Sequence, residues 1–325
     1  MKYQGADLAT FPEQIEYALS HFTADISHLK GKINHVIICG LGGSGIAGRI
    51  TKAYLSSKSS VSIELVADYS LPATATSESL IICSSYSGNT EETLSCFKEA
   101  SAIGASIICI TGGGNLGQLA NENGYPLFHA VPGLQPRMAL GYSLTYLLLI
   151  FETIAGVQIL DELKAAIDKL KKPDWHKGQA RAIMTHLGLT DEKFLQVVSD
   201  APGFAMSVRM QQQLNENSKI WAQVHEMPEM CHNVIEAITH DNLHGPWLLV
   251  NSGTNERNNM RFDYLSNLLK EKGYNLFSLN MDTSSLGNLL DGIFISDWLS
   301  LLIADNHALD SSAIPNIKGL KAYLS

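Results

Sequence analysis

Strand-like and helix-like patterns alternate along the whole chain, and this alternation constrains the fold more than any other feature of the sequence. The strands expected in the first half are short, mainly apolar runs at residues 34–39, 62–67, 80–83, 105–110 and 126–130. Continuous apolar strands are buried on both faces, which is typical of parallel sheets covered by helices. The first half therefore predicts a doubly wound parallel sheet.

The second half of the chain repeats this alternation. Strands are expected at residues 194–198, 247–251 and 275–279, and helices at residues 204–223, 258–272 and 286–304. A chain of 325 residues is long enough for two domains with separate cores. We therefore expect two doubly wound α/β domains. They are residues 1–156, with a leading helix at 11–29, and residues 179–325, joined by a charged connecting segment at 157–178.

A glycine-rich turn, Gly-Leu-Gly-Gly-Ser-Gly-Ile-Ala-Gly at residues 40–48, follows the first expected strand. Its spacing matches a dinucleotide-binding fingerprint, with Glu64 or Asp68 as the ribose-binding acid, but this match alone is weak. A P-loop is excluded, because Arg49-Ile50 stands where that motif needs a lysine and a hydroxyl. The third interpretation is one wall of a phosphate site, in which backbone amides of the turn approach the anion.

A hydroxyl-rich loop, Ser-Tyr-Ser-Gly-Asn-Thr at residues 85–90, follows the third expected strand and precedes a helix. Helix N-termini and neutral hydroxyls both bind phosphate. The two loops should meet at the carboxyl edge of the sheet. A polar N-cap loop without a ligand is the alternative for this segment taken alone. The two loops together favour a sugar phosphate over a dinucleotide, with contacts expected from Gly43, Ser44, Ser85, Ser87 and Thr90.

The composition of the chain restricts the kinds of partner and the cellular location that can be expected. The net charge is −9, with 23 basic against 32 acidic residues, which argues against a nucleic-acid surface. The five cysteines lack CxxC spacing and predict a reduced, cytoplasmic protein. The N-terminus has no apolar signal core, and the longest apolar stretch, residues 138–156, contains Glu152. We expect that stretch to be a buried helix, in the core or at a subunit interface, rather than a membrane span.

Six short motifs occur in order along the chain. They are the glycine turn and the hydroxyl-rich loop, followed by Gln135-Pro136-Arg137-Met138-Ala139, Leu214-Asn215-Glu216-Asn217-Ser218-Lys219, His232-Asn233 and Ile317-x-x-Leu320-Lys321. The ordered set resembles the bifunctional phosphoglucose/phosphomannose isomerases. These form a branch of the phosphoglucose isomerase superfamily and are built from two sugar isomerase (SIS) domains. The resemblance covers the chain from about Ile37 to its C-terminus.

The resemblance implies an aldose-ketose isomerase that interconverts glucose 6-phosphate, and mannose 6-phosphate as well, with fructose 6-phosphate through a cis-enediol. It implies no metal and no organic cofactor. It also implies a homodimer in which His232 reaches the neighbouring subunit's site. The implied phosphate contacts are Ser44, Ser85, Ser87 and Thr90, and the implied catalytic residues are Arg137, Glu216, His232 and Lys321.

These residue types suit the chemistry. Glu216 can carry a proton between two neighbouring carbons, and the fixed charge of Arg137 can stabilise an enediolate oxygen. His232 can titrate near neutral pH during ring opening, and Lys321 can polarise the sugar hydroxyls. Each residue also has an ordinary structural interpretation, such as a solvated carboxylate for Glu216 or a solvated helix-end charge for Lys321. Only the ordered set of motifs favours the catalytic interpretation.

The sequence departs from the family pattern at Arg49, at residues 234–237 and at residues 310–313. Ser312 replaces a threonine that is usual in the family, so we expect it to influence the sugar preference. His225, His232, His240 and His244 lie close in sequence, but without HExxH or matching carboxylate spacing they do not indicate a metal site.

Two other classes of function stay open at this stage. One is a non-catalytic SIS protein that binds sugar phosphates. The other is a nicotinamide-dependent oxidoreductase that uses the glycine turn.

Overall fold

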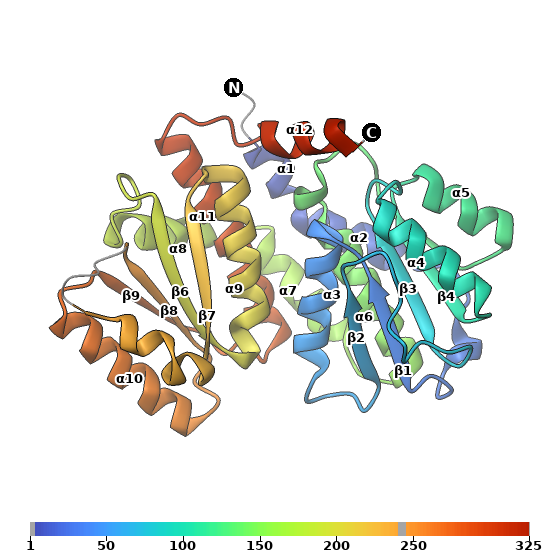
Figure 1. The fold of residues 1–325 in the computed structure, drawn as a ribbon, viewed down its shortest axis with the longest axis horizontal. Helices are drawn as coiled ribbons and strands as arrows, with labels where there is room; N and C mark the ends of the chain where they lie inside the picture. The colour runs from blue at the N-terminus through green and yellow to red at the C-terminus, as the bar shows by residue number, and fades with distance from the viewer. Residues whose placement is uncertain (1–3, 240–244, 325) are drawn as a thin grey trace. The chain divides into compact units, whose positions relative to one another are not determined.

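The computed structural model describes residues 4–239 and 245–324, and its internal contacts divide the chain into two compact units. Residues 9–171 form the first unit, and the described residues from 172 onward, together with residues 4–8, form the second. Each unit is a parallel sheet covered by helices (Figure 1). The expected fold class, two doubly wound α/β domains, is confirmed.

The sheet of the first unit has five parallel strands in the order β2-β1-β3-β4-β5. The strands are β1 (His35–Cys39), β2 (Ser62–Val66), β3 (Leu80–Ser85), β4 (Ser106–Thr111) and β5 (Leu127–His129). β1 and β3 are neighbours, in register from Val36 opposite Leu80 to Cys39 opposite Cys83. The loops that follow these two strands therefore leave from the same edge of the sheet.

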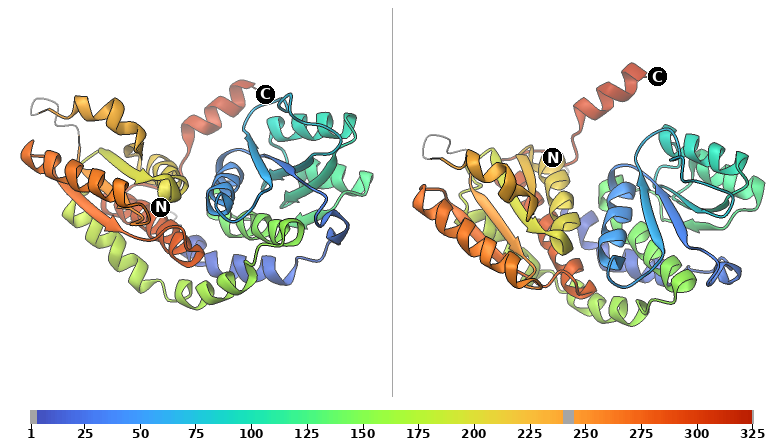
Figure 2. Two further views of the ribbon diagram at one scale, coloured as in Figure 1. Left: turned by 90° about the horizontal axis from the view of Figure 1, so that it is seen from below. Right: turned by 60° about the horizontal axis from the view of Figure 1, so that its bottom comes forward.

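Helices cover both faces of this sheet (Figure 2). α4 (Glu91–Ala102) and α5 (Gly114–Asn123) pack on the face that carries Ile37, Ile81 and Ile107. α3 (Gly42–Leu55) lies on the opposite face against Ile38, as the alternation of side chains along a strand requires, and packs on α6 (Leu140–Ala155). The remaining elements are α2 (Phe11–Ser20), α7 (Leu160–Leu170) and the 3₁₀ turns Ser27–Leu29 and Pro136–Met138; α1 (Gly5–Ala9) begins the described chain.

The sheet of the second unit has four parallel strands in the order β7-β6-β8-β9. The strands are β6 (Phe194–Asp200), β7 (Trp221–Met227), β8 (Trp247–Asn251) and β9 (Leu276–Asn280). As in the first unit, the first strand of the sheet lies between the next two strands of the chain. The first four strands of the two sheets thus share one topology.

Helices also cover the second sheet. α9 (Ala201–Gln213) packs on β6 and β7, and it contacts α11 (Leu286–Asn306), which in turn packs on α8 (Asp174–His186). α10 (Glu256–Glu271) covers the other face, with Phe262 and Leu265 against Leu249. The remaining elements are the π-helical turn Leu214–Ser218, the 3₁₀ turns Glu229–His232 and Val234–Ala237, and α12 (Pro315–Leu324).

Two apolar helices belong to the cores. α6 is buried along most of its length, so the prediction of a buried helix at residues 138–156 is confirmed. Within the described residues, α11 is the one helix that is long and apolar enough to cross a membrane. Of the residues in its most apolar 18-residue stretch, 89% are buried inside the protein, as in the core helix of a globular domain.

The expected helix at residues 204–223 is wrong beyond Gln213. The chain continues through a π-helical turn, Leu214–Ser218, and then forms β7. Lys219 has a left-handed φ of 57°, which ends the helical path, and Trp221–Met227 pair with β6 instead. The expected helix at residues 11–29 is also too long, since α2 ends at Ser20.

The expected connecting segment at residues 157–178 contains helical structure. α7 lies in the first unit and contacts α2, whereas α8 lies in the second unit and packs on α11. The charges of α7 alternate with buried Leu163, Ile167 and Leu170, so they form the solvent face of an amphipathic helix.

Candidate active site

The glycine turn, residues 40–45, joins β1 to α3 through very close backbone contacts. A Cβ atom on Gly43 would lie 2.6 Å from the carbonyl oxygen of Pro136, and one on Gly45 would lie 2.5 Å from the carbonyl oxygen of Gly40. A side chain fits at neither position, because these distances are well below van der Waals contact. The glycines therefore allow the turn to fold tightly and the Pro136 segment to approach it.

The serine loop, residues 84–90, leaves the neighbouring strand. Its first two residues belong to β3, which therefore extends two residues further than the sequence predicts. Ser85 Oγ is 2.8 Å from Thr90 Oγ1 and 3.5 Å from Ser87 Oγ, and it accepts a hydrogen bond from the Gly88 amide at 3.1 Å. The hydroxyls of Ser85, Ser87 and Thr90, three expected phosphate ligands, thus lie together directly before the N-terminus of α4.

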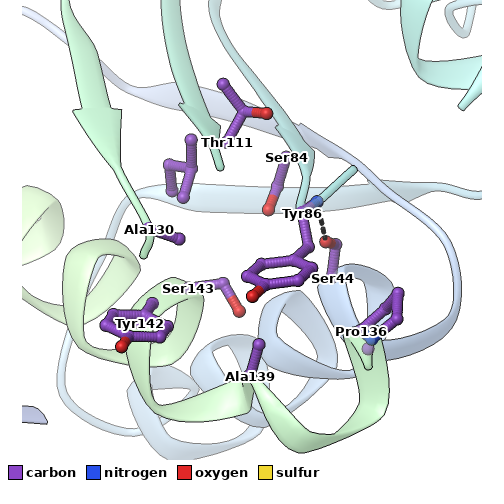
Figure 3. Close-up of a pocket in the computed structure, with 11 residues that line it drawn as sticks. Ser44, Ser84, Tyr86, Thr111, Ala130, Pro136, Ala139, Tyr142 and Ser143 are labelled. Atoms are coloured by element: carbon purple, nitrogen blue, oxygen red, sulfur yellow. Dashed lines mark hydrogen bonds between the residues drawn. The ribbon is translucent and has the colours of Figure 1, made fainter. Parts of the chain in front are cut away.

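The glycine turn and the serine loop meet. The Tyr86 amide donates a hydrogen bond to Ser44 Oγ at 3.3 Å (Figure 3). The helices α3 and α4 begin at residues 42 and 91, so two helix N-termini open beside these hydroxyls. Helix N-termini attract anions through free backbone amides and the helix dipole. The geometry can bind a phosphate group without a cationic side chain.

A third loop supports the serine loop. Gly88 has a φ of 71°, and a Cβ atom there would lie 1.8 Å from the carbonyl oxygen of Gly113. The Gly88 carbonyl accepts a hydrogen bond from the Leu116 amide at 2.9 Å, and the Tyr86 carbonyl accepts one from the Gly112 amide at 3.0 Å. The conformation of the serine loop therefore depends on glycine at position 88.

Arg137 lies beside the glycine turn. It belongs to the 3₁₀ turn Pro136–Met138 and is only 5% exposed. Gln14 of α2 holds this segment from two sides. Its Nε2 donates to the Met138 carbonyl at 2.7 Å, and its Oε1 accepts from the Gly141 amide at 2.9 Å. A buried glutamine on a distant helix thus fixes the Arg137 segment, a role with no local sequence signal.

A small pocket lies among these elements (Figure 3). The glycine turn, the serine loop, the end of β4 and the start of α6 form its walls, with Ser84, Tyr86 and Ser143 among the lining side chains. Its volume of about 10 Å³ is close to the minimum that holds one water molecule. The pocket is far too small for a sugar, and the hydroxyl of Tyr86 donates to the Val131 carbonyl at 2.7 Å beside it.

Glu216 lies in the second unit, on the π-helical turn that follows α9. Asn217 Nδ2 of this turn donates a hydrogen bond to Ser300 Oγ of α11 at 2.9 Å. The preceding helix, α9, is joined to α11 by a buried two-pronged ion pair between Arg209 and Asp297, at 2.9 and 3.0 Å. The half-buried Glu216 carboxylate is therefore carried by a rigid segment.

Lys219 links Glu216 to the segment that carries Ser312. Its ammonium group donates hydrogen bonds to the carbonyl oxygens of Glu216 and Ala313, the latter at 2.8 Å. Ser312 donates to Asp310 Oδ1 from its backbone amide at 2.8 Å and from its hydroxyl at 2.6 Å. These bonds hold the pKa of Asp310 below its usual value. Lys219 ends the motif Leu214-Asn215-Glu216-Asn217-Ser218-Lys219, but the motif alone does not indicate this structural role.

His232 and Lys321 are both exposed in the second unit. His232 ends a 3₁₀ turn that follows β7, and Lys321 lies on α12, none of whose residues is buried. The expected site residues thus form one group in the first unit, around Ser85 and Arg137, and a set in the second unit that comprises Glu216, His232, Ser312 and Lys321.

Among the described residues, no three or more histidines, cysteines or carboxylates are placed to hold a metal ion. His240 and His244 lie outside the described residues. His225, the third neighbour of His232, hydrogen-bonds to Gln196 Oε1 at 2.7 Å, and burial lowers its pKa.

The comparisons with known proteins agree with the motifs. Residues 180–324 match the model of the bacterial phospho-glucose isomerase C-terminal SIS domain, and residues 31–125 match that of the SIS domain. The chain is 32% identical to the bifunctional phosphoglucose/phosphomannose isomerase of Caldicellulosiruptor bescii, over 97% of this chain and 96% of the relative. It is also 32% identical to the protein of the same name from Aquifex aeolicus, over 92% of each chain.

Among solved structures, the chain resembles the C-terminal domain of glucosamine-fructose-6-phosphate aminotransferase from Francisella tularensis. The TM-score is 0.71 and the identity 17%, with 95% of this chain and 97% of that chain covered. At this identity the likeness shows the fold alone. With the two family models, it identifies both α/β domains as SIS domains.

The contact between Gly88 and Gly113 yields a test with a matched control. Gly104 also has a left-handed φ, 69°, but a Cβ atom there meets nothing within 4 Å. Gly104→Ala should cost only the conformational term, about 1–2 kcal/mol of unfolding free energy. Gly88→Ala should cost about 1–3 kcal/mol more through the clash. It should also weaken binding of inorganic phosphate at least about tenfold, a loss of about 1.4 kcal/mol.

Urea denaturation measures the first effect, and titration calorimetry with inorganic phosphate measures the second. Equal stability losses and equal phosphate affinities in the two variants would contradict this description of the serine loop.

Proposed function

The chain belongs to the family of bifunctional phosphoglucose/phosphomannose isomerases, and on that premise we propose that it interconverts glucose 6-phosphate and mannose 6-phosphate with fructose 6-phosphate. The protein is an enzyme of the aldose-ketose isomerase class. Both aldoses give the same open-chain enediol, because they differ only in configuration at C2. One site with one base can therefore serve both substrates.

The observation that carries this proposal is the meeting of the glycine turn and the serine loop. Ser44 Oγ accepts from the Tyr86 amide, and Ser85 Oγ lies 2.8 Å from Thr90 Oγ1, so four groups on two loops face one small region. A 6-phosphate bound there replaces the contacts among the hydroxyls with hydrogen bonds to its own oxygens. Hydrogen bonds from neutral groups are strong enough to position a sugar phosphate and weak enough to release it.

We assign proton transfer to Glu216. Its carboxylate removes the C2 proton of the open-chain aldose while O1 gains a proton, which gives the enediol. Return of the proton to C1 and loss of the proton from O2 then leave the carbonyl at C2. A proton carrier must stay in place between the two steps, and the hydrogen bonds of Asn217 and Lys219 hold the segment that carries Glu216. Arg137 supplies the fixed positive charge that stabilises the negative oxygen of the intermediate.

We assign ring opening to His232 and Lys321. Ring opening requires one proton to reach the ring oxygen and another to leave the O1 hydroxyl. The exposed imidazole of His232 can donate and accept a proton, and the exposed ammonium of Lys321 can polarise hydroxyl groups. Ser312 is our candidate for the residue that tunes the preference between glucose and mannose substrates.

We further propose a homodimer in which His232 acts in the neighbouring subunit's site, and we place the enzyme in the cytoplasm. The exposure of His232 in a single chain supports the first part, since no hydrogen bond to its side chain forms within the described residues. The free thiols of all five cysteines fit a reducing compartment.

A nicotinamide-dependent oxidoreductase and a non-catalytic sugar-phosphate-binding protein each account for fewer of the observed residues and contacts. Of the two acids considered for a nicotinamide ribose, Glu64 accepts a hydrogen bond from Thr74 at 2.8 Å and lies 3.4 Å from His35 Nε2. The glycines of the turn already have a reason in their close contacts with Pro136 and Gly40. A protein that only binds sugar phosphates would need neither Glu216 nor Arg137.

The assignment of Glu216 predicts a specific loss of turnover. Glu216→Gln keeps size and polarity but removes the base. It should lower kcat about 10²–10⁴-fold on both aldose phosphates and change KM little. The rates are measured in the presence of EDTA, where the wild-type enzyme should keep full activity.

Glu271→Gln is the matched control, because Glu271 is a largely exposed carboxylate at the end of α10 in the same unit. It should leave kcat and KM unchanged. A wild-type enzyme that is inactive in EDTA, or a Glu216→Gln variant as active as the control, would rule out the proposed role.

The assignment of His232 to the neighbouring subunit predicts complementation. A hybrid dimer of one Glu216→Gln subunit and one His232→Ala subunit contains one site with both defects and one intact site. It should recover about half of the wild-type activity per dimer. The hybrid is made by coexpressing the two variants with different affinity tags and purifying over both.

Both homodimeric variants, purified in the same way, are the controls. A doubly purified hybrid that is no more active than these controls would place His232 in the site of its own subunit. Failure to recover any doubly tagged species would overturn the proposed dimer itself.

A further inference from the structure

A second cluster of buried hydroxyls lies at the carboxyl edge of the second sheet. Asp200 ends β6 and precedes α9, and Ser252 follows β8 in the loop that leads to α10. The Ser252 hydroxyl donates a hydrogen bond to Asp200 Oδ2. Asp200, Ser252 and the nearby Thr283 are at most 5% exposed, and none of them has a place in the proposed reaction.

This cluster is the counterpart of the serine loop. β6 and β8 are neighbours in the second sheet as β1 and β3 are in the first, and each strand is followed by a helix of at least 12 residues. Ser252 Oγ is 2.8 Å from Thr254 Oγ1, the distance found between Ser85 and Thr90. Between the two hydroxyls lies a left-handed glycine in both loops, Gly253 with a φ of 73° and Gly88 with 71°.

The two clusters differ in one group. The glycine turn of the first unit carries no acidic side chain, whereas the corresponding turn of the second unit carries the Asp200 carboxylate. The N-termini of α9 and α10 favour a negative charge at this place. Burial raises the pKa of Asp200, and hydrogen bonds from Ser252 oppose that rise.

The cluster contains hydroxyl groups that the carboxylate leaves unsatisfied. Ser199 Oγ and Thr283 Oγ1 are buried and have no hydrogen-bond partner among the described residues. A Cβ atom on Gly203 would lie 3.4 Å from Thr283 Oγ1 and 3.7 Å from Asp200 Oδ1, so these two atoms flank the first turn of α9. A carboxylate has two oxygens, and a phosphate has four. Unsatisfied hydroxyl groups are therefore expected where a carboxylate lies in a site whose shape suits the larger oxyanion.

We propose that the second unit contains a second oxyanion site, the counterpart of the serine-loop site, and that the Asp200 carboxylate occupies it as the protein's own anion. The wild-type chain therefore binds one phosphate, in the first unit. The second site becomes open to a free oxyanion such as inorganic phosphate when the Asp200 side chain is shortened.

Hydrogen exchange with and without inorganic phosphate tests this proposal. In Asp200→Ser, which keeps a residue suited to cap α9, phosphate should slow exchange of the amides at residues 203–205 and 252–255. At a concentration ten times its dissociation constant, the slowing should be about tenfold. In the wild-type protein the same amides should not respond to phosphate.

Asp282→Ser is the matched control, because Asp282 is an exposed acid in the loop after β9 that bonds to Ser284. It should behave as the wild-type protein does. A phosphate response of residues 203–205 and 252–255 in the wild-type protein, or its absence in Asp200→Ser, would overturn the proposal.

Asp200→Asn decides the question if the serine variant does not fold. The amide has the size of the carboxylate and keeps the site filled, so exchange at residues 203–205 and 252–255 should be faster than in the wild-type protein and unaffected by phosphate. Unchanged exchange would overturn the proposal, because the carboxylate would then be dispensable there.

Exchange of the amides in the serine loop is an independent measurement in the same samples. Phosphate should slow exchange at residues 86–91 in every variant if the first unit holds the substrate phosphate. Loss of that response would count against the proposed function, whereas the second site is judged only by its own amides.

Discussion

The close approach of Gly43 to the carbonyl oxygen of Pro136 is the constraint on which the candidate site of the first unit depends. With no side chain at position 43, the backbone before Arg137 can lie directly against the start of α3. Ser44 then reaches the Tyr86 amide, and the serine loop is placed beside the same helix end. A single methyl group at position 43 would separate the arginine from the hydroxyls. The glycines of the turn are thus required by packing, and the proposed anion site is a consequence of that packing.

In the second unit, buried polar contacts hold the candidate site residue Glu216 in place. The ion pair between Arg209 and Asp297 joins α9 to α11 in a dry environment, and the bond from Asn217 to Ser300 extends this link to the turn of Glu216. Such contacts hold the carboxylate of Glu216, the proposed base, more precisely than a solvated loop would. Removal of either charge of the pair would leave the other buried and unpaired, which is strongly destabilising.

Much of the fold follows from the sequence, because buried parallel strands are continuous apolar runs. The sequence does not reveal the strand at Trp221–Met227, because no glycine or proline separates it from the glutamine-rich end of α9. The helical path ends instead at the left-handed Lys219. The helix boundary at Ser20 was missed for a similar reason. Local patterns cannot show where a tertiary pairing, here β7 with β6, overrides helix propensity.

The candidate site was predictable where short motifs carry it and not where distant residues support it. Ser44, Ser85 and Thr90 lie together as the order of the strands requires. In contrast, Gln14 supports the Arg137 segment from 124 residues away. The local sequence gives Asp200 no role, and only the packing of Ser252 against it reveals the likeness of the two units.

The proposed reaction proceeds by proton transfer through an enediol, and incorporation of deuterium from the solvent tests this step. Fructose 6-phosphate is converted by the wild-type enzyme in D₂O with EDTA present, and the products are analysed by proton NMR. The account predicts deuterium at C2 of both glucose 6-phosphate and mannose 6-phosphate, because the base exchanges its proton with solvent. Products that carry only protium at C2 would contradict the account, since they would indicate direct hydride transfer from C1.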